Sequence, residues 1–381
     1  MTEQRIRRGR KLLGRGLAVA ILASVSTTGL PAAPAASLAG TPLWQEIPTP
    51  NAGTSRNLLR DVAPVSSDDA WAVGAFFDAE AQAERSLVEH WDGRAWTIVP
   101  VPTVGAGWQS LWGVSALSAR DVWAVGATSE RFGPERSLIL RWNGRRWRVL
   151  EGPEFENWSA LEDVSAVSER EAWAVGNSYL GSFIIRWDGR SWRIVPSPNV
   201  GWLASIHAIS SSNVWVVGVR GAAGGAVYMP LILHWDGTRW SEVPSPTPST
   251  QFSILEDVSG RSDDLAWAVG SAWDGGGLPR PIVERWDGAD WRFVPGPAVD
   301  DGELLGVAGV SATEAWAVGR SGGRTLIARW DGVGWSAVDA PSPGVDDRLI
   351  GVSVLPSGET WAVGASNGTS GERTLALRHV R

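Results

Sequence analysis

Short apolar segments separated by turn-forming residues follow one another from about residue 44 to the end of the chain. Segments of this length, bounded by Gly, Pro, Asn, Asp and Ser, are typical of β-strands. One tetrapeptide, Trp followed by Ala or Val, then Val and Gly, marks seven copies of a longer repeat. It begins at Trp71, Trp123, Trp173, Trp215, Trp267, Trp316 and Trp361. The spacing of 42 to 52 residues predicts a repeat architecture, and we number the copies repeats 1 to 7.

Each repeat contains the pattern of four short strands. The first begins at a Leu twelve residues before the tetrapeptide, and the Ser and acidic residues after this strand predict a turn. The tetrapeptide forms the second strand, and we expect its Gly to end that strand. A third strand leads into Trp-Asp-Gly-x-x-Trp, in which Asp-Gly predicts a hairpin to the fourth strand; repeat 2 has Asn143 and Gly144 there.

Seven units of four antiparallel strands predict an all-β fold, a seven-bladed β-propeller. Repeat 7 stops at His379 without a fourth strand, whereas the segment around Trp44 has the sequence of a fourth strand. An open ring would leave two sheet edges exposed. We therefore expect the N-terminal strand around Trp44 to complete the C-terminal blade, with residues 40–381 forming a single domain.

The strand that ends in Gly, the aromatic-Asp turn, the following Trp and the Pro-rich exit resemble the kelch-type repeat. Kelch blades usually carry two Gly residues and a Tyr before the Asp, whereas this chain has one Gly and a Trp. The pattern is also similar to that of secreted bacterial proteins with W-A-V-G and W-D-G-x-x-W repeats. The Asp-Gly turn partly resembles the Asp-box of sialidases but lacks one residue. The resemblance covers residues 44–381 and implies the propeller fold without implying an activity.

Residues 1–39 have the pattern of an export signal, with six basic residues, an apolar stretch of about 14 residues from Leu17 to Leu30, and small residues at candidate cleavage sites. The apolar stretch is short for a membrane span. We expect cleavage near Ala35 or Ala39 and a secreted, cell-surface or periplasmic protein without stable membrane insertion; an uncleaved anchor is the alternative.

The composition narrows the classes of partner and chemistry. Residues 1–39 hold six of the 34 basic and one of the 41 acidic residues, so residues 40–381 carry a formal net charge of −12. This charge repels phosphate backbones and argues against nucleic-acid binding. The chain has no Cys, and its four His are scattered, so we expect no metal and no cofactor. We also expect a monomer.

Candidate site residues fall where the repeats differ. In a four-stranded blade, the 2–3 loops and the links between blades share one face, and variable loops on a rigid frame are where binding usually occurs. The aromatic residues in these segments are Trp108, Trp158, Trp202, Trp273, Tyr179 and Tyr228. They suit sugar rings or peptide side chains, although they could instead simply cover the blade ends.

A second variable position follows the constant Leu and starts the innermost strand. It holds Arg60, Trp112, Glu162, Ala204, Glu256, Leu305 and Ile350, which we expect to ring the mouth of a central channel. Asp61, Asp163 and Asp257 lie beside them where other repeats have Gly or Ser. These carboxylates could bind a cation or a polar ligand, or they could cap backbone amides.

Three functions fit the sequence. The favoured one is an exported binding or scaffold module that recognises a glycan or an extracellular protein through the variable face. The second is a secreted glycoside hydrolase-like enzyme that uses carboxylates at the channel mouth, since glycosidases need two carboxyl groups about 5–10 Å apart. The third is a structural cell-surface protein without a small ligand. No catalytic residue is assigned.

Overall fold

The computed structural model describes residues 44–131, 133–221, 228–246, 252–273, 277–369 and 371–380. These residues form 28 β-strands and no helix. No helix suited to crossing a membrane is found in this described part of the chain.

The strands follow the predicted repeats. Repeats 1 to 3 comprise β2 (Asn57–Ser66), β3 (Asp69–Asp78), β4 (Ala83–Trp91), β5 (Trp96–Ile98), β6 (Gln109–Ser118), β7 (Asp121–Ser129), β8 (Glu135–Trp142), β9 (Trp147–Val149), β10 (Ser159–Ser168), β11 (Glu171–Ser178), β12 (Gly181–Trp187) and β13 (Trp192–Val195). Repeats 4 and 5 comprise β14 (Trp202–Ser210), β15 (Asn213–Gly221), β16 (Tyr228–Trp235), β17 (Trp240–Glu242), β18 (Phe252–Ser262), β19 (Leu265–Trp273), β20 (Arg280–Trp286) and β21 (Trp291–Val294). Repeats 6 and 7 comprise β22 (Glu303–Ser311), β23 (Glu314–Ser321), β24 (Arg324–Trp330), β25 (Trp335–Val338), β26 (Asp346–Val354), β27 (Thr360–Gly368) and β28 (Gly371–His379), which β1 (Gln45–Glu46) joins.

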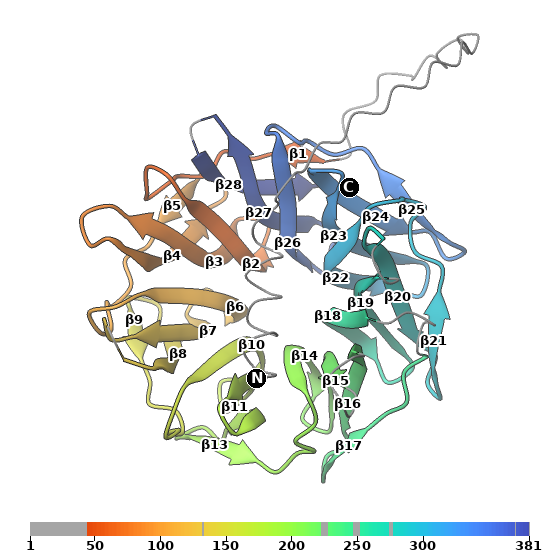
Figure 1. Ribbon diagram of the computed structural model, residues 1–381, viewed down its shortest axis with the longest axis horizontal. Helices are drawn as coiled ribbons and strands as arrows, with labels where there is room; N and C mark the ends of the chain where they lie inside the picture. The colour runs from red at the N-terminus through yellow and green to blue at the C-terminus, as the bar shows by residue number, and fades with distance from the viewer. Residues whose placement is uncertain are drawn as a thin grey trace.

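The sheets are arranged radially around a central axis, as in a β-propeller (Figure 1). Among the described residues, the strands form five sheets of four strands and one of eight. The eight-stranded sheet contains repeats 4 and 5, which share a single parallel residue pair between Tyr228 and Phe252. The hydrogen-bonded sheets therefore number six where the sequence predicts seven blades, because this one pair joins two neighbouring repeats.

The turns form as their sequences predict. At the hairpin between β4 and β5, Asp92 accepts hydrogen bonds from the amides of Arg94 and Ala95, both 2.9 Å long. Gly93 adopts a φ of 90°, a region that glycine enters without a steric penalty. Asp92 and Gly93 thus fix the four-residue loop that brings Trp91 opposite Trp96.

The glycine of the tetrapeptide has a different role from the one expected, since the second strand continues beyond it. In β3, Gly74 is followed by four more strand residues, and a Cβ there would lie 1.9 Å from the carbonyl oxygen of Leu58. The other six tetrapeptide glycines face an equally close carbonyl, at 1.8 to 2.3 Å. The glycine is therefore required because the first strand approaches it closely.

Tryptophan rings join each repeat to the next. Trp71 packs edge-on against Trp147 of repeat 2, with ring centroids 5.5 Å apart. Equivalent edge-on pairs connect the other repeats: Trp123 with Trp192, Trp173 with Trp240, Trp215 with Trp291, Trp267 with Trp335, and Trp361 with Trp96. All these rings are buried, so the core lies mainly between adjacent sheets.

The N-terminal strand completes the last sheet, as the sequence predicts. β1 pairs antiparallel with β28 through Gln45 with Arg378 and Glu46 with Leu377. Trp44 is fully buried and meets Trp316 edge-on at 5.3 Å, the position that a fourth-strand Trp occupies in the other repeats. The two ends of the chain are thereby held in one sheet.

A cation-and-ring arrangement recurs between the second and third strands of several repeats. The Arg141 guanidinium lies over the Trp123 ring at 4.5 Å and forms two hydrogen bonds with the Asp121 carboxylate. Arg186 and Arg378 form the same arrangement with a tetrapeptide Trp and a neighbouring Glu. His90 takes the Arg position in repeat 1, where its ring packs at a tilt against the tetrapeptide Trp and its Nε2 lies 2.9 Å from Asp69.

Candidate functional site

A β-bulge at the start of each repeat positions the variable residue that follows the constant Leu. In repeat 1, Leu59 pairs with Gly74 and Asp61 with Val73, so Arg60 is the extra, unpaired residue. The other six repeats have the same shift in register. A bulge re-aims the side chain of the extra residue. All seven of these residues, as the sequence predicts, border one central opening.

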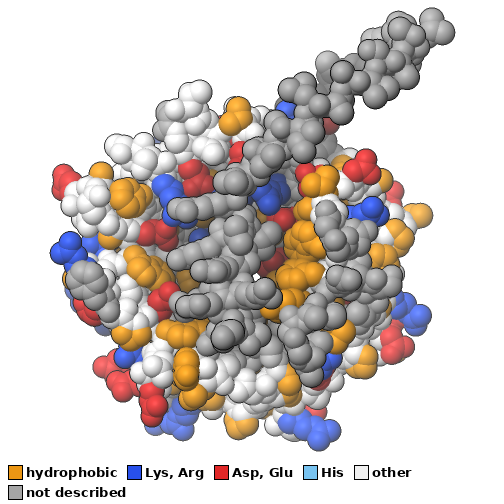
Figure 2. Space-filling view, viewed as in Figure 1, with side chains coloured by type: hydrophobic (Ala, Val, Ile, Leu, Met, Phe, Trp, Pro, Cys, Tyr) orange, Lys and Arg blue, Asp and Glu red, His pale blue; other side chains and the backbone are white. Residues whose placement is uncertain are grey.

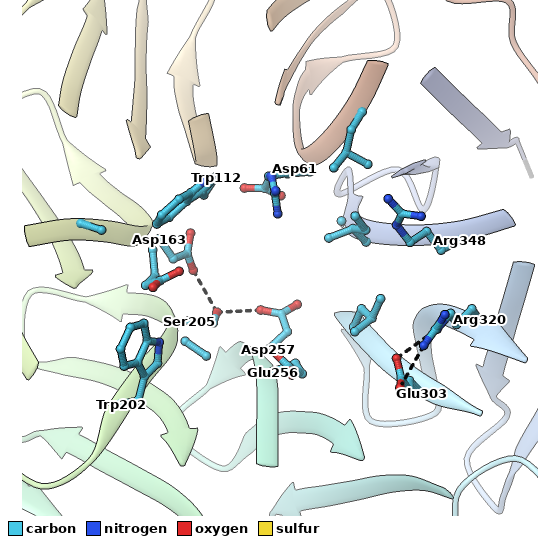
Figure 3. A pocket seen from close by; sticks show the side chains of 18 of the residues that line it. Asp61, Trp112, Asp163, Trp202, Ser205, Glu256, Asp257, Glu303, Arg320 and Arg348 are labelled. Carbon is cyan, nitrogen blue, oxygen red and sulfur yellow. Dashed lines mark hydrogen bonds and ion pairs between the residues drawn. The ribbon is translucent and has the colours of Figure 1, made fainter. Parts of the chain in front are cut away.

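That opening is a cavity of about 1030 Å³ on the axis of the molecule (Figure 3). Eight of the ten predicted site residues line it: Arg60, Trp108, Trp112, Trp158, Glu162, Trp202, Glu256 and Trp273. Two separate sequence signals predict these residues: one is the variable links and loops, and the other is the variable position on the innermost strand.

Paired aromatic rings form the wall contributed by repeats 2 to 5. Trp108 and Trp112 are stacked with centroids 6.5 Å apart, and Trp158 and Trp202 are stacked with centroids 5.8 Å apart. Trp273 instead meets Phe252 edge-on at 4.8 Å. All five Trp side chains are half-buried, so each retains exposed ring surface.

Two predicted aromatic residues lie elsewhere. Tyr179 is 56% exposed in the turn between β11 and β12, and Tyr228 packs against Phe252 with centroids 5.0 Å apart. Neither is among the described residues that line the cavity.

Ion pairs form the wall contributed by repeats 1, 6 and 7. Arg320 donates hydrogen bonds of 3.1 and 3.3 Å to Glu303 (Figure 3). Arg348 pairs with Glu372, which also lies 3.5 Å from Arg56. Sequence reasoning missed these residues.

Strand periodicity is the signal that could have identified two of them. Glu303 and Arg348 each lie two residues before a bulged residue, and side chains two positions apart share one face of a strand.

Three aspartates beside the bulges connect the first strands to one another. Asp61 accepts hydrogen bonds from its own neighbour Val62 and from Val114 of repeat 2, at 2.8 and 2.7 Å. Asp163 accepts hydrogen bonds from the amides of Val164 and of Ile206 in repeat 4. Asp257 accepts them from the amides of Val258 and of Val307 in repeat 6. These carboxylates therefore cap backbone amides, one of the two roles that the sequence suggests.

Asp163 and Asp257 also share one hydroxyl group (Figure 3). Ser205 Oγ lies 2.9 Å from Asp163 Oδ2 and 2.7 Å from Asp257 Oδ1. Burial raises the pKa of Asp163 to about 6 and that of Asp257 to about 7. Burial also raises the pKa of Asp61 well above its ordinary value. The Ser205 hydroxyl has one hydrogen, so it can donate to only one of the two carboxyl groups. When the other carboxyl group carries a proton, it can donate that proton to Ser205 Oγ, and both short contacts are then hydrogen bonds.

The acidic groups of the described residues are not clustered like the ligands of a metal centre. Within the described ranges, no three His, Asp or Glu side chains are grouped so that they could hold a metal ion. Glu162 is buried and accepts a hydrogen bond of 3.2 Å from the side-chain amide of Asn177. Figure 2 shows charged side chains of both signs and hydrophobic side chains interspersed on this face of the molecule, both at its edge and nearer its middle.

Comparisons with known proteins show the fold. No family model and no curated protein matches the chain. Among solved structures, YCF48 bound to a D1 peptide is 16% identical, with a TM-score of 0.59 over 90% of this chain and 98% of that one. An inactive virginiamycin B lyase from Staphylococcus aureus with quinupristin is 15% identical, with a TM-score of 0.58 over 88% of this chain and 99% of that one.

A third similar structure is the extracellular domain of BT4673, a putative one-component system of B. thetaiotaomicron. It is 11% identical, with a TM-score of 0.54 over 88% of this chain and 39% of that one. At these identities the likeness concerns the β-propeller fold alone.

Proposed function

We propose that this chain is an exported seven-bladed β-propeller that binds an extracellular glycan or protein segment in its axial cavity. The observation that carries the proposal is the gathering of eight predicted residues, separated by up to about two hundred positions in the chain, around one cavity. Binding sites are usually concave and combine aromatic surface with polar groups that orient the ligand, and this cavity has both.

The blade count follows from the strand order. Repeats 4 and 5 each have the same order of four strands as the other repeats, and only one residue pair links them. We therefore count them as two blades, which gives seven. We also infer that the repeats are related to kelch-like repeats of secreted bacterial proteins, on the basis of the Trp-Asp-Gly turn and the second-strand glycine.

Export rests on residues 1–39, which lie outside the described residues. We expect a signal peptidase to remove them, because every sheet is formed by residues from Gln45 onward. Mass spectrometry of the protein purified from cells that express the full chain should show an N-terminus near residue 36 or 40. An intact N-terminus on membrane-bound protein would instead support an uncleaved anchor.

The aspartate contacts weaken the case for a hydrolase. Asp163 and Asp257 each accept backbone amides from two repeats, so their oxygens hold strands together. A structural role without a ligand remains as the second candidate, favoured by the stacked Trp pairs, which also cover strand ends. The complex of the similarly folded YCF48 with a peptide illustrates that such a fold can hold a protein segment.

The test is a binding screen against arrays of glycans and of peptides. The wild-type protein is compared with a variant in which Trp108, Trp158, Trp202 and Trp273 are Ala. A Phe293→Ala variant serves as control, since Phe293 is 48% exposed on the fourth strand of repeat 5 and lies outside the cavity lining. Binding by wild type and control but not by the folded Trp variant supports the proposal. Absence of binding in both arrays favours the structural role.

A further inference from the structure

The hairpin of repeat 2 carries a concentration of positive charge that the other repeats lack. It joins β8 to β9, the outermost strand of its sheet (Figure 1), and follows the end of β8, whereas Glu135 at the start of β8 lines the cavity. Residues 118–121 and 141–148, which include this hairpin and the turn beside it, hold five Arg and one acidic residue. The equivalent residues of repeat 5, 262–265 and 285–292, hold two Arg and four Asp. The same pair of turns therefore carries opposite charge in the two repeats.

Four of these arginines are exposed and form no ion pair with any described residue: Arg120, Arg145, Arg146 and Arg148. Arg120 packs against the hairpin, since a Cβ on Gly144 would lie 2.9 Å from its Cγ. The fifth, Arg141, is held in an ion pair and donates to the carbonyl oxygen of Glu169 in the next turn, where Arg170 balances the Glu169 charge. Four guanidinium groups around one hairpin are thus available to a ligand.

The geometry of the hairpin does not require this charge. Asn143 takes the place of the Asp in the other five complete hairpins, and its side-chain oxygen accepts the same two amides, from Arg145 and Arg146, both at 3.1 Å. The two positions after the Gly hold Arg-Ala, Arg-Ser, Thr-Arg, Ala-Asp and Val-Gly in the other hairpins. Uncharged and acidic residues therefore form the same turn.

Arg148 also differs from its equivalents in other repeats. Arg193 and Arg292 each pair with the hairpin Asp of their own repeat, whereas Asn143 offers Arg148 no carboxylate. Arg148 lies directly opposite Arg141 in the strand pairing, and like charges in that position destabilise a sheet. A charge that costs stability and is not needed for the turn points to a role in binding.

A partly exposed aromatic ring adjoins the arginines. Trp142, at the start of the hairpin, is half-buried, whereas the equivalent rings of four other repeats are buried: Trp91, Trp187, Trp235 and Trp330. The third-strand Arg of one repeat covers the Trp of the next, as Arg141 does at 5.8 Å from the Trp187 centroid, but repeat 1 has the shorter His90. Aromatic surface beside charged donors suits a sugar ring that carries acidic substituents.

We propose that the hairpin of repeat 2 is a second binding surface, which takes an anionic extracellular polysaccharide. Guanidinium groups pair through forked donors with the oxygens of sulfate, phosphate or carboxylate groups, while Trp142 packs against the sugar. Charges more than about 8 Å away are largely screened at physiological ionic strength, so the local arginines outweigh the formal charge of −12 on residues 40–381. The surface shares no residue with the described lining of the axial cavity, so the inference is independent of the function proposed for the cavity.

Binding of the protein, purified from cells that express the full chain, to immobilised polymers tests the proposal. The polymers are dextran sulfate, phosphomannan and polygalacturonate, which distinguish the three acidic groups, with neutral dextran as control. We expect binding to at least one charged polymer and none to neutral dextran, with affinity falling about tenfold or more between about 50 and 500 mM salt. No binding to any charged polysaccharide, or tighter binding to polyglutamate or to phosphatidylglycerol vesicles, would overturn the inference.

Matched variants locate the contact. Asn143→Asp restores the carboxylate of the other hairpins and keeps the turn, so it should weaken binding about threefold or more without lowering the melting temperature. Arg145→Gln combined with Arg146→Gln should weaken binding about tenfold or more. Arg94→Gln combined with Arg239→Gln removes the charges at the same two positions of repeats 1 and 4, and should change binding less than about twofold. Equal effects of the two double variants would contradict binding at repeat 2.

The variant that lacks the four cavity Trp separates this surface from the cavity. It should bind the charged polysaccharide as the wild-type protein does. Loss of that binding would identify the polymer as a ligand of the cavity, which would overturn the inference while sustaining the proposed function.

Discussion

At the scale of single residues, close backbone contact explains the glycine that recurs in all seven tetrapeptides. The bulge brings the carbonyl before each constant Leu against the second strand, as Trp202 does against Gly218. The sequence shows that the glycine recurs but not why, because the contact partner belongs to another strand. The bulge and the glycine therefore form a single feature of the fold.

Gly218→Ala should destabilise the protein by at least about 2 kcal/mol, because its Cβ would lie 2.0 Å from the Trp202 carbonyl oxygen and the strands would have to separate. Gly368→Ala is the control, since no atom lies within 4 Å of a Cβ there. Thermal unfolding followed by tryptophan fluorescence measures both. Similar melting temperatures for the two variants would contradict this account.

Replacing a buried glutamate should have the opposite effect and stabilise the protein. Glu89 is fully buried, and neither carboxyl oxygen has a hydrogen-bond partner among the described residues. The equivalent positions of repeats 2, 4 and 7 hold Leu140, Leu233 and Leu377. Glu89→Leu should therefore stabilise the protein by about 1–3 kcal/mol at pH 7.5. Glu284→Leu, which loses a hydrogen bond from Ser245, should stabilise it less. A lower melting temperature for Glu89→Leu would show that the carboxyl group is needed.

At the scale of elements, the first strand is short but holds the last sheet closed. β1 contains two residues, yet Trp44 beside it fills the space between repeats 6 and 7 against Trp316. Its contribution therefore comes mainly from the buried ring, with few backbone hydrogen bonds.

Trp44→Ala should cost about 3–5 kcal/mol, the usual range for truncating a large buried side chain. Differential scanning calorimetry would measure the loss. Ile98→Ala, at a fourth-strand side chain that is 42% exposed, should cost less than about 1 kcal/mol. If the two substitutions cost the same, the N-terminal strand does not close the ring.

The elements and their closure could be predicted because repetition reveals them, while the site could be predicted only in part. The position after the constant Leu is variable in sequence, and the structure places all seven of its residues at the cavity. The Arg and Glu wall depends on pairs such as Arg320 with Glu303, which only the register of β22 with β23 brings together. Tyr179 and Trp273 occupy equivalent positions after the second-strand glycine of repeats 3 and 5. In repeat 3, however, the short turn between β11 and β12 keeps Tyr179 away from the axis.

At the scale of the whole molecule, the aspartate contacts join repeats 1 with 2, 3 with 4 and 5 with 6. Each Asp accepts a hydrogen bond from the amide that follows the small residue at the equivalent position of the next repeat, which is Gly113, Ser205 or Gly306. Asp and a small residue thus alternate at this position from repeat 1 to repeat 6. A ring with an odd number of repeats cannot complete the alternation, and the neighbouring repeats 6 and 7 both have Gly at this position. Ser205 extends the contacts to Asp257, so repeats 3 to 6 form a continuous series.

Buried carboxyl groups should make stability depend on pH. Burial raises the pKa of Glu89 to about 8, that of Asp257 to about 7 and that of Asp163 to about 6, from ordinary values of 4.5 or 3.8. The folded protein then holds protons that the unfolded chain releases, so these groups contribute full stability below about pH 4 and lose it as pH rises through about 6 to 8. The melting temperature should be lower at pH 8.5 than at pH 5.5, and Glu89→Leu should reduce the difference. An unchanged or higher value at pH 8.5 would contradict the assignment.

The bulged position at the start of each repeat has a consequence for how binding specificity can change. The bulged residue has no paired residue on the neighbouring strand. The seven copies already include basic, acidic, aromatic and small aliphatic side chains on the same backbone. Substitutions there alter the chemistry of the cavity wall while the strands beside them keep their partners. The fold thus separates the residues that determine its stability from those that, under the proposed function, would contact a ligand, and the cavity wall can be changed by evolution or engineering one repeat at a time.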